Sequence, residues 1–217
     1  MFDPEQLADS LIAIPNVVCV VLGGSRAAGT HRPDSDWDLG LYYEGSLDAD
    51  HLRALGHAGQ VFGTGEWSPL MDGGAWFDID GTKVDVIYRE VGAVQHWIDE
   101  AEAGRFKVEL LGGFIAGFDT TVLVGEAAIC TPIRGELPFA VTAYPEALRQ
   151  SAPAAWRARR DFSRMYAEQH AERGDDVMVQ AMRARAAIEE AHAVLAERGE
   201  WVLNEKGLLA RAGLGSS

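Results

Sequence analysis

Short apolar runs separated by glycine, proline and polar turns dominate the first 104 residues. After Asp3 and Pro4, a favourable helix start, leucines and isoleucines recur with roughly helical spacing up to residue 14. The β-branched run VVCVVL at residues 17–22 predicts a buried strand, and WDLGLYY at residues 37–43 predicts a second one. The N-terminal part therefore combines helices with strands.

The same alternation continues through the next segment. We expect a helix around residues 48–58 and a Gly-rich loop over residues 63–74. The segment WFDIDGTKVDVIYRE predicts a β-hairpin around Asp80 and Gly81, because this pair suits turns that need positive φ. Residues 90–104 have the pattern of a helix.

The character of the sequence changes near residue 136. The chain beyond it is rich in Ala, Arg, Glu and Leu and has a hydrophobic period of 3.6 residues, which predicts at least two long packed helices and a short third in NEKGLLARAG. One helix face would consist of Val177, Ala181, Ala184, Ile188, Ala191 and Leu195. The predicted fold class is α+β, with a mixed sheet flanked by helices in residues 1–135 and a helical bundle domain in residues 136–217.

The distribution of charge restricts the partners of the protein. The 217 residues carry a net charge of −14, and residues 1–125 hold 20 acidic and 7 basic side chains. Such a surface repels a duplex phosphate backbone and attracts metal ions and cationic small molecules, so we expect no nucleic-acid partner. The start of the sequence is acidic, and no apolar run is long enough to cross a bilayer, so we expect no membrane association and a cytoplasmic location.

Two aspartates open the second predicted strand. Asp36 and Asp38 alternate with Trp37, so in a strand their carboxylates share one face, about 7 Å apart along the chain. Carboxylates in a low-dielectric site repel each other unless a cation lies between them, and Mg²⁺ prefers carboxylate and phosphate oxygens. Asp85, charged within KVDVIYR, is a candidate third ligand. Taken alone, it is better explained as a solvated acid on an edge strand.

Gly23, Gly24 and Ser25 follow the first predicted strand. Glycines at a strand end let backbone N–H groups approach a phosphate closely, and the serine adds a hydroxyl donor. The segment is neither a Walker loop nor a dinucleotide fingerprint. It approximates the Gly-x-Ser-x-Gly elbow of serine hydrolases but has Ala27 in place of the second glycine. A bare Gly-Gly-Ser is more often a turn than a site.

In combination these features resemble the polymerase-β-like nucleotidyltransferase superfamily. The shared order is a strand, Gly24-Ser25, ten residues, Asp36-x-Asp38, a further strand and the distant Asp85. The resemblance implies that the glycines and serine hold the phosphates of a nucleoside triphosphate, while Asp36 and Asp38 bind Mg²⁺, with two ions expected. Asp85 would complete the metal site or act as the general base.

Two basic residues lie close to these motifs. Arg26 is within reach of a triphosphate, although pairing with a nearby acid explains it equally well. Lys83 lies two residues before Asp85 and either contacts phosphate or forms a cross-strand ion pair. The predicted nucleotide-binding residues are Gly23, Gly24, Ser25, Arg26 and Lys83, and the predicted catalytic and metal-binding residues are Asp36, Asp38 and Asp85.

A core of this kind followed by a helical domain is similar to small bacterial enzymes that adenylylate antibiotics such as aminoglycosides or lincosamides. This resemblance implies transfer of a nucleoside monophosphate, AMP from ATP, onto a hydroxyl of a small cationic acceptor, with release of pyrophosphate and a role in antibiotic resistance. No acceptor-binding motif is recognisable outside the core. Trp67 and Trp76 are either core residues or the lining of an acceptor or base pocket.

Three other functions stay open at this stage. An antitoxin-type nucleotidyltransferase that modifies a protein partner would share the core motif. A non-catalytic nucleotide-binding module would bind Mg·ATP without turning it over. A metal-free serine hydrolase is the weakest alternative, because it leaves Asp36 and Asp38 unexplained.

Overall fold

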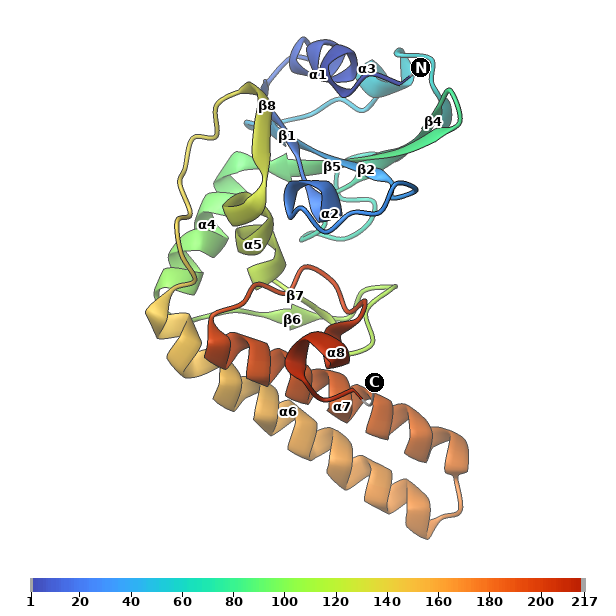
Figure 1. The fold of residues 1–217 in the computed structure, drawn as a ribbon, viewed down its shortest axis with the longest axis vertical. Helices are drawn as coiled ribbons and strands as arrows, with labels where there is room; N and C mark the ends of the chain where they lie inside the picture. The colour runs from blue at the N-terminus through green and yellow to red at the C-terminus, as the bar shows by residue number, and fades with distance from the viewer. Residues whose placement is uncertain (1, 216–217) are drawn as a thin grey trace. The chain divides into compact units, whose positions relative to one another are not determined.

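A computed structural model describes residues 2–215 of the chain, which divide into two compact units (Figure 1). The first unit combines the chain up to His96 with Glu126–Val141, and the second combines Trp97–Gly125 with the chain from Thr142 onward. Residues 97–125 thus pack with the C-terminal helices. The division into a catalytic domain of residues 1–135 and a helical domain of residues 136–217 stays a prediction.

A six-stranded mixed sheet forms the centre of the first unit. Its spatial order is β3-β4-β5-β2-β1-β8, and β2 and β5 pair in parallel whereas the other neighbours are antiparallel. The strands are β1 (Val17–Leu22), β2 (Trp37–Tyr43), β3 (Ala58–Val61), β4 (Gly74–Ile79), β5 (Thr82–Glu90) and β8 (Thr131–Gly135). The predicted α+β fold class is confirmed.

The predicted hairpin is present as β4 and β5. Asp80 and Gly81 connect them with φ of 54° and 78°, the left-handed conformation that this dipeptide favours. The predicted helix over residues 48–58 is wrong in extent, because only the single turn α3 (Asp50–Arg53) forms and β3 begins at Ala58. Gly56, with φ of 75°, ends the helical segment and turns the chain toward the sheet.

Helices of the first unit begin with α1 (Pro4–Ile12), where the Asp3 carboxylate accepts a hydrogen bond from the Glu5 N–H at 2.9 Å and caps the first turn. The single turn α2 (Gly24–Ala27) follows β1. The helices α4 (Val91–Glu102) and α5 (Thr121–Ile129) each include residues of both units. None of the helices within residues 2–215 is both long and apolar enough to cross a membrane.

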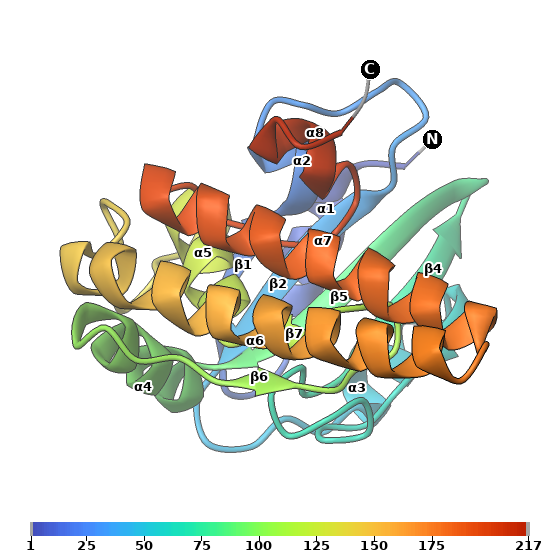
Figure 2. The ribbon, with the colours of Figure 1, turned by 90° about the horizontal axis from the view of Figure 1, so that it is seen from below.

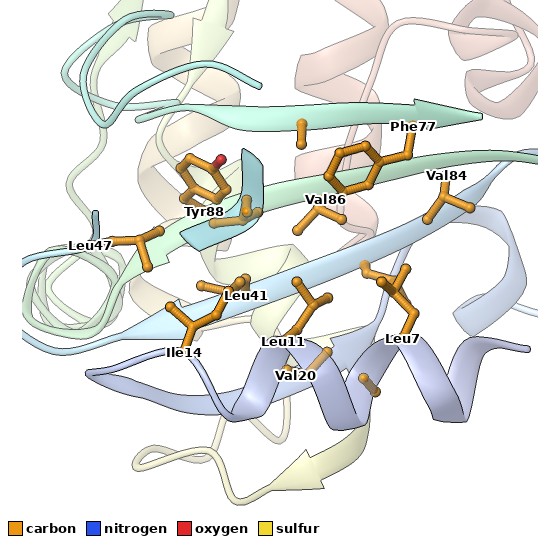
Figure 3. Packing of buried hydrophobic residues seen from close by; sticks show 14 of the residues in the cluster. Leu7, Leu11, Ile14, Val20, Leu41, Leu47, Phe77, Val84, Val86 and Tyr88 are labelled. Carbon is orange, nitrogen blue, oxygen red and sulfur yellow. The ribbon is translucent and has the colours of Figure 1, made fainter. Parts of the chain in front are cut away.

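The strand pleat gives the sheet two chemically different faces. One face carries the core, in which Leu7 and Leu11 point from α1 toward Leu41 and Val86 (Figure 3). All four of these side chains are almost fully buried, so this face anchors the sheet through apolar packing. The residues that alternate with them, including Asp38 on β2 and Asp85 on β5, belong to the opposite face.

The second unit is built on a helical hairpin of α6 (Glu146–Glu172) and α7 (Asp176–Arg198), which run side by side in both ribbon views (Figure 2). It also contains the strand pair β6 (Val108–Glu109) and β7 (Phe118–Asp119) and the short helix α8 (Leu208–Ala212). Glu189, fully buried in α7, accepts hydrogen bonds from Ser163 Oγ at 2.7 Å and from Arg185 Nε at 2.9 Å.

The predicted apolar face of α7 is only half correct. Ile188, Ala191 and Leu195 are buried, whereas Val177 is 77% exposed and the neighbouring positions Ala181 and Ala184 are exposed as well. The exposed residues lie in the half of α7 next to the turn from α6. A two-helix hairpin buries only the narrow seam between its helices, so other apolar positions near such a turn remain at the surface.

Candidate functional site

Asp38 and Asp85 are direct neighbours across the parallel strand pair. The register of β2 and β5 makes them partners, and both side chains are half-buried. Partners in a parallel ladder point to the same face, and neighbouring strands lie about 4.8 Å apart. Two carboxylates so placed repel each other, and a divalent cation that binds to both removes this cost. The pair therefore has the donor chemistry that Mg²⁺ requires.

Asp36 lies outside the strand ladder. β2 begins at Trp37, and Asp36 is exposed in the preceding loop. Within residues 2–215 no group of three or more His, Cys, Asp or Glu side chains is arranged as a metal site. The structure thus brings Asp38 and Asp85 together and leaves Asp36 at the edge, and the three-aspartate metal site stays a prediction.

The Gly-Gly turn is built directly against Asp38. The Gly23 N–H donates a hydrogen bond to the Asp38 carbonyl at 2.8 Å. Gly24 has φ of +57°, and a Cβ at this position would lie 2.9 Å from the Asp38 Cβ and would collide with its carboxylate. Any side chain at position 24 would therefore be strained and would displace Asp38. The half-buried Ser25 follows in the single turn α2.

Arg26 organises the loop that leads to the aspartates. Its guanidinium donates hydrogen bonds to the main-chain oxygens of Ser35 at 2.6 Å and Asp36 at 3.2 Å, and it lies 4.2 Å from the centroid of the Trp37 ring. These contacts are to carbonyls and an aromatic face, and pairing of Arg26 with a nearby acid stays a prediction. Arg26 positions the entry to β2, and its predicted contact with nucleotide stays a prediction.

Lys83 shares the face of β5 that carries Asp85, because the two residues are two positions apart in the strand. Its side chain is exposed, and its partner in the register of β4 is Asp78. The location is compatible with the cross-strand pairing considered from the sequence. Contact with a phosphate stays a prediction.

A hollow extends over the same face of the sheet from the turn toward β5. Gly23, Gly24, Asp38, Gly40 and Ile87 are among its lining residues. Gly40 lies at the middle of β2, where a Cβ would be only 2.8 Å from Val21 Cγ2. Because glycine has no side chain, nothing projects from β2 into the hollow at this position.

An ion pair at the far side of this hollow was not identified from the sequence. Arg89, only 3% exposed, donates from Nε to Glu126 Oε2 at 2.7 Å and from a terminal nitrogen to Oε1 at 3.0 Å. It also donates to the main-chain oxygens of Met71 and Tyr88. Burial alone would lower the pKa of Arg89, but the Glu126 carboxylate raises it, so the guanidinium is charged. The charge of Arg89 directly after the apolar residues 86–88 was the available signal.

Three aromatic rings lie at the other side of the carboxylate pair. Trp76, on β4, is the register partner of Asp85 and is 46% exposed. Its ring stacks on Trp67 with a centroid distance of 5.6 Å and contacts Phe62 at 4.8 Å. The sequence singled out both tryptophans. The structure leaves Trp76 exposed beside its register partner Asp85, and Trp67, which stacks on Trp76, is half-buried.

Part of the chain is similar to a known protein family. Residues 5–91 match the family model described as "Nucleotidyltransferase domain", and this range contains all the predicted site residues. No curated protein gave a significant sequence match. A solved structure of a nucleotidyltransferase-like protein from Exiguobacterium sibiricum 255-15 aligns with a TM-score of 0.46 and 12% identity, over 98% of this chain. The chain spans 63% of that protein's length. Residues 5–91 are thus similar to the nucleotidyltransferase domain family.

Proposed function

We propose that the protein is a Mg²⁺-dependent nucleotidyltransferase that moves a nucleoside monophosphate, AMP from ATP, onto a hydroxyl of a small-molecule acceptor. The observation that carries this proposal is the register pair of Asp38 and Asp85 beside a glycine turn, inside a segment similar to the nucleotidyltransferase domain family. Carboxylates bind divalent cations and backbone N–H groups bind phosphate, so a glycine turn beside two carboxylates supports a nucleotide site.

Each group has a defined task in this proposal. The turn at Gly24 and the Ser25 hydroxyl hold the triphosphate, and Asp38, Asp85 and Asp36 would hold Mg²⁺. The bound cation would neutralise the charge that develops on the phosphate oxygens. The acceptor oxygen forms a bond to the α-phosphorus while the bond from that phosphorus to the pyrophosphate oxygen breaks. A carboxylate accepts the proton of the acceptor hydroxyl, with Asp85 either in this role or as the third ligand of the cation, and pyrophosphate leaves.

Positioning provides most of the proposed catalysis. Phosphoryl transfer needs little covalent help from the protein, whereas alignment of the acceptor oxygen with the phosphorus removes a large entropic barrier. The close packing of Gly24 on Asp38 supports this role, because it links the phosphate-binding turn to the carboxylate pair without intervening side-chain freedom.

Calorimetric titration tests the proposal. Mg·ATP, Mg·CTP, Mg·GTP and Mg·UTP are titrated into wild type, an Asp36→Asn/Asp38→Asn double variant and the control Asp34→Asn, an exposed residue of the same loop. We expect the wild type and the control to bind a triphosphate only with Mg²⁺ and the double variant to lose binding. Wild type that binds none of the four overturns the proposal.

An acceptor screen by pyrophosphate release then examines turnover. Transfer to an aminoglycoside such as kanamycin would support a role in antibiotic resistance. Pyrophosphate release only in the presence of a co-purifying protein would point instead to modification of a protein partner. If the protein bound Mg·ATP but released no pyrophosphate with any acceptor tested, the enzymatic part of the proposal would be contradicted.

A further inference from the structure

The exposed aromatic cluster of Phe62, Trp67 and Trp76 has no role in the proposed nucleotide site. All three rings contact one another, since Phe62 and Trp67 also approach to 5.5 Å between centroids. Three aromatic rings normally gain most by burial in a core. Here Trp76 is 46% exposed and the other two are half-buried, so their surface is available to a ligand.

The backbone holds this cluster in place. Trp67 lies against β4 at Gly74, where a Cβ would be 3.0 Å from Trp67 Cζ3 and closer still to Cη2. The Trp67 N–H donates to the Asp72 carbonyl at 3.0 Å, and the Asp72 N–H donates to the Ser68 carbonyl at 2.9 Å. The Asp72 carboxylate accepts from the Tyr43 hydroxyl at 2.7 Å, which ties the loop to β2. A ring fixed in this way loses little entropy when a ligand stacks on it.

The position of the cluster relative to the carboxylates is set by strand register. Trp76 pairs with Asp85, and Asp85 pairs with Asp38, so the three residues form one row across β4, β5 and β2 on one face. The Gly23 N–H, bonded to the Asp38 carbonyl, continues the row on the opposite side. The aromatic rings and the glycine turn therefore lie on opposite sides of the carboxylate pair.

This order assigns a side to each substrate. In a displacement at phosphorus the attacking and leaving oxygens are in line, on opposite sides of the phosphorus. If the triphosphate lies on the glycine turn, the acceptor approaches from the opposite side, past Asp85 and onto the aromatic rings. The inference in this step rests on the proposed function.

The chemistry of the surface limits the acceptor further. An indole face attracts a cation through its quadrupole and packs against an apolar ring face. Asp85 adjoins Trp76 in the register, and Asp78 lies two positions after Trp76 on the same face of β4. Lys83 is the register partner of Asp78, whose carboxylate also accepts a hydrogen bond from the Gly81 N–H at 2.8 Å. Carboxylates beside a flat apolar surface favour a ligand that is both ring-shaped and positively charged.

We propose that Trp76, supported by Trp67 and Phe62, is the acceptor subsite, and that it takes a protonated amine carried on a ring. Trp76 would determine acceptor specificity without holding the nucleotide. Its removal should therefore affect acceptor binding and leave binding of Mg·ATP unchanged.

Two binding measurements on the full chain test this assignment. Kanamycin, 2-deoxystreptamine and tyramine serve as ring amines, with uncharged cyclohexanol as comparison, and Mg·ATP is titrated separately. The variants are Trp76→Thr, which removes the ring but keeps a residue suited to strands, the conservative Trp76→Phe, and the control Phe162→Ala, an aromatic residue 59% exposed on α6.

We expect at least one ring amine to bind the wild type and Phe162→Ala with equal affinity. The same amine should bind Trp76→Thr about 10-fold more weakly and Trp76→Phe with nearly the affinity of the wild type. The affinity for Mg·ATP should be the same in all four proteins. Failure of every ring amine to bind the wild type, or equal binding by Trp76→Thr, overturns the acceptor subsite.

The nucleotide titration separates this failure from failure of the proposed function. Wild type that binds Mg·ATP but no ring amine keeps the proposed function and loses the subsite. Weaker binding of Mg·ATP by Trp76→Thr would place the nucleotide base on Trp76 and would also overturn the assignment. If the wild type binds ring amines but no triphosphate, the proposed function fails while a ring-amine site remains.

Discussion

Asp38 on β2 and Asp85 on β5 are partners in a parallel strand pair, although 46 residues separate them in the sequence. Their carboxylates lie on the face of the sheet opposite to the α1 core, and two carboxylates on neighbouring strands repel each other unless a cation or a donor group lies between them. Such repulsion is typical of a binding site, because a bound cation converts it into affinity.

Mg²⁺ should therefore raise the thermal stability of the wild type. A ligand that binds only the folded state stabilises it by an amount that grows with the ratio of the free ligand concentration to Kd. At a Mg²⁺ concentration about 100-fold above Kd, we expect Tm to increase by a few degrees. Asp85→Asn should abolish most of this increase and lower turnover about 100-fold or more. Differential scanning fluorimetry with Mg²⁺ or EDTA measures the first effect. A full Mg²⁺ response in Asp85→Asn would contradict the metal assignment.

Gly24→Ala should destabilise the protein and weaken triphosphate binding. Gly24 and Gly29 both have positive φ, of 57° and 68°, but only at Gly24 would a Cβ collide with another group, the Asp38 carboxylate. Each substitution costs about 1–2 kcal/mol for the left-handed backbone conformation, and the collision adds roughly 1 kcal/mol or more at Gly24. Urea unfolding compares the two variants. If Gly24→Ala and Gly29→Ala had equal stabilities, or lost equal affinity for Mg·ATP, the contact of residue 24 with Asp38 would be unimportant.

Removal of one partner from the pair of the buried Arg89 and the partly exposed Glu126 should destabilise the protein far more than removal of one partner from an exposed pair. Glu126→Gln leaves the 3% exposed guanidinium of Arg89 without its counter-charge, so we expect a loss of about 3 kcal/mol in the free energy of unfolding. Glu100→Gln removes the partner of the 62% exposed Arg105 and should cost less than about 1 kcal/mol. Denaturant unfolding of both variants measures the difference, and similar costs would argue against this role of burial.

A buried histidine of the second unit predicts acid sensitivity. His192 stacks on Trp156 at 4.1 Å between centroids, and burial lowers its pKa to about 3 from the ordinary 6.5. Below pH 6.5, His192 therefore binds a proton in the unfolded chain, whereas in the folded protein it stays neutral until the pH approaches 3. Stability from this group is present above pH 6.5 and is lost as pH falls toward 3, by about 2 kcal/mol at pH 5.

Asp119, whose Oδ2 lies 3.6 Å from His192 Nδ1, acts in the opposite direction. Burial raises its pKa to about 6, so its contribution is present below pH 4 and is lost as pH rises through 6. The comparison of wild type with His192→Gln at pH 7.5 and pH 5 largely removes this background. We expect acidification to destabilise the wild type more than the variant, whereas parallel losses would refute the assignment. The exposed His51→Gln serves as control.

Local patterns along the chain determined most of the elements. The apolar runs became β1 and β2 with the expected bounds, and the Asp80-Gly81 turn formed the expected hairpin. The segments of residues 90–104 and the Ala-rich C-terminal part became α4, α6 and α7. These predictions succeeded because side-chain period and turn conformation are properties of neighbouring residues. The length of α3 and the exposed half of α7 were wrong because both depend on what packs against the helix.

Only the tertiary structure decided which chemical groups meet. The carboxylates of Asp38 and Asp85, the indole of Trp76 and the Gly23 N–H form one row because strand register aligns segments far apart in sequence. Arg89 forms an ion pair with Glu126 of α5, and residues 97–125 pack in the same unit as the C-terminal helices. The sequence by itself therefore determined most of the elements and the residue types of the candidate site, through local periodicity and motif spacing. Pairing between strands depends on packing energies summed over the whole sheet, and these energies have no local signature in the chain.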